Sequence, residues 1–304
     1  MPELAPQPLP DTRSTDFQFL PRTILFGTDF SAACQNAWPY ALALAREYNS
    51  RLLLVHVIDS AMFAAVPSEL AREAREQVRR EKEDQMKDLQ LSENSPRIDF
   101  EPLLQEGEIA DVLLRIVQER SVELLVAGTR GRSRTKRLLL GSVAEKLFRQ
   151  ATCPSLIVPE RASFGERFAV TRILCPIDFS AASYVAVDFA KSIARRQRAQ
   201  LILTHVLREH LANGKAEKEW AVHDAQHRLR KFLVGDQDLP FESLIEVAVG
   251  AAAEQVSRTA MEYHADLIVV SVHPGAETIA HERERNAYKI IRWSRCAVLT
   301  IPRS

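Results

Sequence analysis

The sequence predicts an α/β fold of two tandem domains, each a doubly wound, Rossmann-like sheet of five parallel strands. Three observations lead to this prediction: the chain length, an internal repeat, and the alternation of short apolar runs with helical segments. The chain has 304 residues, about twice the size of a usual domain. Its apolar fraction of 46% is enough for two buried cores.

Four segments of the first half recur in the second half. The pairs are "RTILFGTDFSAA" (22–33) with "TRILCPIDFSAA" (171–182), "RLLLVHVI" (51–58) with "QLILTHVL" (200–207), "VELLVAGT" (122–129) with "ADLIVVSV" (265–272), and "CPSLIVP" (153–159) with "CAVLTIP" (296–302). The first two pairs are offset by 149 residues and the last two by 143. Six residues are therefore missing from the middle of the second copy, where a charged surface helix or its loop can change length cheaply.

Each copy alternates predicted strands and helices. "TILFGT", "RLLLVHVI" and "ELLVAG" are typical of buried parallel strands. Residues 68–91 carry charge almost all round, which predicts an exposed helix with a thin apolar stripe. Residues 108–120 predict a helix with one apolar face. That face consists of Ile109, Val112, Leu113, Ile116 and Val117.

Composition excludes several classes of function. Lys+Arg and Asp+Glu balance at 40 each, so no overall field favours nucleic acid or an anionic membrane. Residues 1–21 are Pro-rich and lack the pattern of a signal peptide, so we expect a disordered tail and a cytoplasmic protein. No apolar run approaches the roughly 20 residues of a membrane span. The four scattered cysteines predict buried thiols and no metal site.

The candidate site follows two predicted strands. Asp29 comes after the first strand and Gly128 after the fourth, so both face one crevice if these strands are neighbours. Gly128-x-x-Gly131, nine residues and then Gly141-Ser142 enclose a basic loop. The loop's cations are Arg130, Arg132, Arg134, Lys136 and Arg137. A helix starting at Gly141-Ser142 would offer free N–H groups to phosphate. A plainer interpretation stays open, namely a solvated loop followed by a capping box of Ser142 and Glu145.

The spaced glycines, "TDFS" and "HV" together resemble the universal stress protein family, over nearly the whole chain. The resemblance implies a first domain at 22–160, a linker at 161–169 and a second domain at 170–304. It implies that ATP, with or without Mg²⁺, binds the first domain, and that the last strands of the two copies meet in an internal pseudo-dimer. Asp29 and the backbone of Val57 would hold adenine. The complete predicted site comprises Thr28, Asp29, Val57, Gly128, Arg130, Gly131, Arg132, Gly141, Ser142 and Val143.

The second copy departs from this pattern. Ser271, Pro274, Glu284 and Arg285 stand at the four motif positions, and the basic loop is replaced by "HPGAETIA". A carboxylate where phosphate should sit repels it, and proline removes an N–H donor. We therefore expect one nucleotide per chain, with Asp178 serving only as a turn or cap residue.

Three functions compete. The first is a regulatory stress-response protein in which nucleotide orders the 129–140 loop for an unknown protein partner. The second is a slow ATPase or an adenylating enzyme, although the sequence pairs no nucleophile with a base and we predict no catalytic residue. The third is an interaction module that binds no nucleotide. His56 and His205 are interpreted as core or crevice-lining imidazoles, and further homodimerisation stays open.

Overall fold

The structure, a computed structural model, describes residues 17–91, 98–129, 141–162, 169–209, 214–234, 239, 241–272 and 279–302. The first domain contains β1 (Thr23–Gly27), α1 (Ala32–Tyr48), β2 (Arg51–Asp59), the 3₁₀ turn η1 (Ser60–Phe63), α2 (Ser68–Leu91), β3 (Asp99–Gly107), α3 (Ile109–Glu119), β4 (Leu124–Gly128), α4 (Ser142–Gln150) and β5 (Ser155–Val158). The second contains β6 (Arg172–Pro176), α5 (Ala181–Gln197), β7 (Gln200–Leu207), α6 (Lys215–Lys231), β8 (Leu244–Val249), α7 (Ala252–Glu262), β9 (Leu267–Val272), α8 (Ile279–Trp293) and β10 (Ala297–Pro302).

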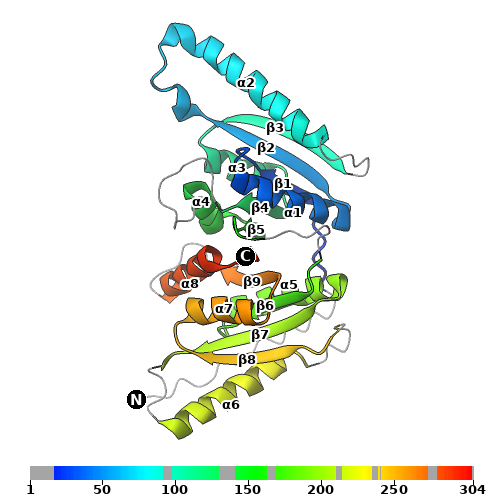
Figure 1. Ribbon diagram of the computed structural model, residues 1–304, viewed down its shortest axis with the longest axis vertical. Coiled ribbons are helices and arrows are strands. Elements are labelled where there is room, and N and C mark those ends of the chain that lie inside the picture. Colours follow the sequence, from blue (N-terminus) through cyan, green and yellow to red (C-terminus); the bar gives the residue numbers. More distant parts are fainter. Residues whose placement is uncertain are drawn as a thin grey trace.

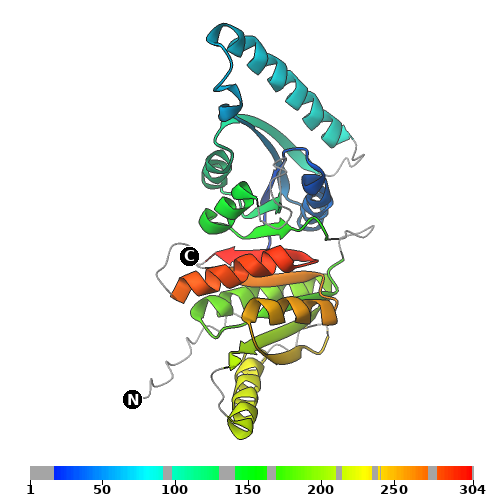
Figure 2. The same cartoon turned by 60° about the vertical axis from the view of Figure 1, so that its left-hand side comes forward.

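The ten strands within the described residues form one sheet in the order β3-β2-β1-β4-β5-β10-β9-β6-β7-β8. Each domain contributes five parallel strands, which confirms the predicted fold class. The terminal strands β5 and β10 pair antiparallel, with Leu156 opposite Leu299. β5 is labelled at the middle of the molecule in Figure 1, and the red β10 lies beside it in Figure 2. The internal pseudo-dimer is therefore confirmed, and pairing removes two apolar sheet edges from solvent.

Helices cover both faces of each half of the sheet (Figure 2). In the first domain α1 and α2 pack into one core, and α3 and α4 into the core on the opposite face. The predicted apolar face of α3 is buried at Val112, Leu113, Ile116 and Val117, together with Ala110. Buried side chains of α1 and α5 belong to one continuous cluster, so the core runs through the junction of the domains.

The difference in length between the copies falls in the outer helices. Helix α2 has 24 residues and α6 has 17, and they lie at opposite ends of the molecule (Figure 1). Most side chains of α2 are exposed, whereas Lys82 and Met86 are buried. This is the thin stripe that the sequence predicts.

The last residues of the predicted tail are not disordered. Phe19 is buried, its N–H donates to the hydroxyl of Ser192 at 2.7 Å, and its ring lies 5.0 Å from that of Phe189. Phe17 contacts the same Phe189 ring at 4.7 Å. The boundary expected at residue 21 is wrong because aromatic side chains at the end of a Pro-rich segment find an apolar surface on α5. Residues 1–16 lie outside the described part of the chain.

Two further expectations concern thiols and membranes. Cys34, Cys153 and Cys175 are free and buried, and Cys296 is free and half-buried. Burial raises the pKa of Cys153 to about 12. Among the described helices, none is both long enough and apolar enough to cross a membrane.

Candidate functional site

The strands that carry the predicted site are neighbours. β1 pairs in parallel with β4, with Phe26 opposite Val126. Asp29 and Thr129 each follow three residues later, so the two loops leave the sheet at the same edge. β1 also pairs with β2, and the strand order reverses here, which is where doubly wound sheets bind ligands.

Asp29 forms the turn between β1 and α1. Its Oδ1 accepts from the N–H of Ser31 at 2.9 Å, and Phe30 adopts a left-handed φ of 60°. The hydroxyl of Ser31 then caps α1 by accepting from the N–H of Cys34. Asp178 accepts from the N–H of Ser180 at 3.0 Å in the same way. The aspartate therefore has a structural role in both copies, as expected for Asp178.

Thr28 and His56 hold the end of β1. Both are buried, and Nδ1 of His56 lies 2.7 Å from the carbonyl oxygen of Thr28. Since a carbonyl only accepts, Nδ1 carries the hydrogen. The ladder between β1 and β2 ends at Gly27 and Val55, two residues before Val57. Val57 continues instead in the ladder with β3.

An aromatic stack beneath the turn was missed by the sequence analysis. The ring of Phe30 lies 4.8 Å from His56, and Nζ of the buried Lys82 lies 5.4 Å from the Phe30 ring centroid. The second domain repeats the arrangement with Phe179, His205 and Arg228. The sequence held a signal for this stack: "DFS" occurs in both copies, and each copy also has a charged helix that can supply a cation to its phenylalanine. Because the stack persists where the glycine motif is lost, it supports the turn and not a phosphate.

The two ends of the glycine loop, at Thr129 and Gly141, meet at the edge of the sheet. Gly128 ends β4 opposite Val158 of β5, and the N–H of Gly141 donates to the carbonyl of Thr129 at 2.8 Å. This bond places the start of α4 directly beyond the end of β4. Arg130, Gly131 and Arg132 of the predicted site lie outside the described residues.

The alternative interpretation of Ser142 and Glu145 as a capping box is wrong. The N-cap of α4 is Gly141, with φ −62° and ψ 148° and no side-chain cap, so Ser142 is already inside the helix. Glu145 instead pairs with Arg149 at 3.3 Å. The cap shifts because the chain returns to the sheet at Gly141. Gly141 therefore supplies no capping side chain to the N–H groups at the start of α4, whose first two residues are Ser142 and Val143.

The second domain begins the equivalent helix elsewhere. Helix α8 starts at Ile279, six residues before Arg285, the counterpart of Ser142. The backbone at positions 284 and 285 therefore lies within the helix and not at its free end. Pro274 and the side chain of Glu284 fall outside the described part. The two crevices therefore differ in two ways: the motif residues are changed, and α8 extends further toward its N-terminus than α4 does.

The electrostatics of the site do not favour a nucleophile. Burial raises the pKa of Cys34 to about 12, with a further contribution from the charge of Asp29, so this thiol stays protonated at neutral pH. Burial lowers the pKa of His205, and Arg228 adds to the effect. Among the described residues no cluster of His, Cys, Asp and Glu could hold a metal ion. The arrangement offers hydrogen-bond donors to an anion.

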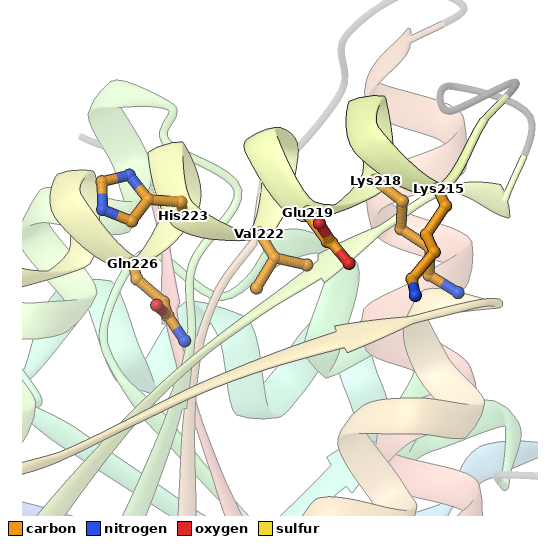
Figure 3. A pocket seen from close by; sticks show the side chains of 6 residues that line it. All are labelled: Lys215, Lys218, Glu219, Val222, His223 and Gln226. Atoms are coloured by element: carbon orange, nitrogen blue, oxygen red, sulfur yellow. The ribbon is translucent and has the colours of Figure 1, made fainter.

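Two of the hollows on the described surface lie beside helices α1, α2 and α6. One, of about 360 Å³, lies beside the Asp29 turn between α1 and α2, and is lined by residues that include Thr28, Phe30 and Trp38. The other, of about 400 Å³, lies along α6 in the second domain. All its lining side chains come from that one helix (Figure 3). Only the first adjoins the predicted site.

Comparison with known proteins shows what the chain is similar to. The model of the universal stress protein family matches residues 21–159 and 169–302, once for each copy. A universal stress protein of Methanocaldococcus jannaschii is 28% identical over 138 residues, covering 45% of this chain and 81% of its own length. Universal stress protein YxiE of Bacillus subtilis is 32% identical over 146 residues, covering 43% and 93%. The crystal structure of a universal stress protein from Archaeoglobus fulgidus has a TM-score of 0.69 at 19% identity, covering 93% of this chain and 96% of that one.

Proposed function

The chain belongs to the universal stress protein family through both of its domains, and on that premise we propose that it is a regulatory protein with one adenine-nucleotide site. ATP, with or without Mg²⁺, binds the first domain at the carboxyl edge of β1 and β4. The second domain binds none. The observation that carries this proposal is the contrast between α4, which starts at an uncapped glycine, and α8, which runs through the same position.

The phosphates lie at the start of α4. Its N-cap, Gly141, offers no side chain to the first N–H groups, and the helix dipole adds partial positive charge. Gly141 lets phosphate oxygens approach the backbone, and the exposed Ser142 adds a hydroxyl donor. Arg130 and Arg132 supply charge-assisted hydrogen bonds to the outer phosphates, and Gly131 gives the loop room to approach them.

The nucleoside lies toward β1 and β2. The carboxylate of Asp29 accepts from the amino group of adenine. The backbone of Val57, beyond the end of the β1–β2 ladder, completes the adenine contact. Nucleotide binding orders the 129–140 loop, and a protein partner binds to the surface that this change creates.

The Gly141→Glu variant tests the site, because it copies the residue of the second domain. The conformation at 141 is open to any residue, and Glu108 already caps α3 from a similar conformation. We therefore expect an intact fold, checked by circular dichroism, and loss of ATP binding. Isothermal titration calorimetry of the parent should saturate near one ATP per chain, and the variant should show no binding.

The contrary outcomes are specific. Unchanged ATP affinity in a folded Gly141→Glu chain would remove the phosphate assignment. Saturation of the parent at two equivalents would mean that the second domain also binds.

A further inference from the structure

Helices α1 and α5 meet at the junction of the two domains. Nε of Arg196 lies 2.9 Å from a carboxylate oxygen of Glu47. These residues are 149 positions apart, the same offset that relates Asp29 to Asp178. Glu47 and Arg196 are therefore counterparts in the two copies. Their contact lies on the local two-fold axis that relates the two domains. On this axis a residue of one domain meets the corresponding residue of the other domain.

Because of this placement, the charges that meet at the axis depend on which two domains are paired. Two first domains joined in the same way would bring Glu47 against a second Glu47. Two second domains would bring Arg196 against a second Arg196. Like charges brought together at an interface disfavour that pairing, whereas opposite charges favour it. Only the mixed pair places opposite charges at the axis.

The segment before β1 adds a second asymmetry. The N–H of Phe19 donates to the hydroxyl of Ser192, and Ser192 is 9% exposed. The counterpart of Ser192 in α1 is Ala43, which has no side-chain oxygen. A first domain docked on another first domain would leave this donor without its acceptor, which is costly for a buried backbone group.

The same preference extends to an aromatic contact. The guanidinium of Arg196 lies 4.8 Å from the ring centroid of Tyr48, and the Tyr48 ring packs against Phe19 at 5.9 Å. The counterpart of Tyr48 in α5 is Gln197, which has no ring. Cation–π contacts of this kind favour association, and here only a first domain supplies the ring.

We propose that this face of the first domain selects the second domain as its partner over another copy of itself. The partner that fits carries an arginine at the axis and a hydroxyl at position 192 of the facing helix. The pairing of β5 with β10 within the chain is an arrangement that satisfies these contacts. This inference does not depend on the nucleotide.

Charge exchange in the full chain tests the proposal. Arg196→Glu reproduces the contact of two first domains, and Glu47→Arg that of two second domains. Combining both changes restores opposite charges. Hydrogen exchange of the amides in the β5–β10 ladder reports opening of the junction. We expect each single variant to exchange about two- to fivefold faster than the parent, the range of a partly exposed ion pair, and the double variant to recover most of the loss.

Two controls separate repulsion from lost contacts. Arg196→Gln removes the attraction without adding a like charge, so it should exchange more slowly than Arg196→Glu. Ser192→Ala should speed exchange at the amide of Phe19, whereas Ala43→Ser, at the counterpart position, should not. The proposal would be overturned if the two charge changes acted independently. In that case the rate increase in the double variant would equal the product of the increases in the two single variants. Equal rates for Arg196→Gln and Arg196→Glu would also overturn the proposal.

Discussion

At the scale of single residues, the turn after the first strand is built twice from the same parts. Asp29 and Asp178 each accept from the backbone two residues later. His56 and His205 each use Nδ1 to bond a carbonyl at the end of the preceding strand. Both imidazoles are therefore structural, as their place in apolar strands predicts. Hydrogen bonding to a carbonyl fixes the ring without requiring a charge.

The lowered pKa of His205 gives a pH prediction. The unfolded chain binds a proton near pH 6.5, whereas the folded chain does so only at lower pH, because burial opposes the charged ring. Between these two values the unfolded state holds more protons, so stability falls as pH falls. His205→Asn keeps a donor for the carbonyl of Ile177 and removes the titration. Urea unfolding from pH 7.5 to 5.5 should show a smaller loss of stability in the variant. Parallel pH profiles for the two proteins would contradict the assignment.

At the scale of elements, α1 and α4 begin in different ways although serine stands near both starts. Ser31 is the N-cap of α1, and its hydroxyl accepts from the N–H of Cys34. Ser142 is the first residue inside α4, after an N-cap glycine. The Ser31 hydroxyl satisfies one backbone donor of its helix, whereas a glycine N-cap has no side chain that could do so. The cap of α4 therefore stabilises its helix less than the cap of α1, and under the proposed function the N–H groups of α4 serve the ligand.

This difference can be measured by removing each hydroxyl. Ser31→Ala should lower the free energy of unfolding by about 1 kcal/mol, the usual contribution of a serine N-cap. Ser142→Ala should change it by less than about 0.5 kcal/mol while weakening ATP binding in the calorimetric titration. Chemical denaturation of the two variants gives the comparison. A cost for Ser142→Ala equal to that of Ser31→Ala would restore the capping interpretation.

At the scale of the whole molecule, the junction of β5 and β10 makes one sheet from two domains. The ladder is supported by a buried hydrogen bond from the hydroxyl of Thr300 to the carbonyl of Ser155 at 3.1 Å. Without the second domain, β5 would be an apolar edge strand open to other chains. The two domains therefore protect each other from association.

A chain reduced to residues 22–160 should for this reason dimerise or aggregate. Glu47 would face a second Glu47 in such a dimer, which weakens the association but leaves the strand edge open. Size-exclusion chromatography with light scattering checks the outcome across a range of concentrations. A soluble monomer at all concentrations would show that the edge is protected in another way.

The sequence by itself determined the two α/β units, the order of their elements, and the acid and glycine beside the crevice. These features are local, because apolar periodicity and turn residues specify strands, helices and loops over short distances. The apolar face of α3 and the thin buried stripe of the otherwise exposed helix α2 belong to this class.

Only the tertiary structure decided which residues meet across the chain. The S-x-x-E pattern at Ser142 is a valid capping signal, yet the return of the chain to Thr129 moves the cap to Gly141. Phe19 lies at the end of a Pro-rich segment, so its sequence context does not indicate an ordered position. It is held in place by contacts with Ser192 and Phe189 of α5. In the sequence, nothing distinguishes Glu47 and Arg196 from other surface charges. The pairing of β5 with β10 brings them into contact. Each outcome rests on contacts that a local pattern does not encode, since their energy depends on where distant segments are placed.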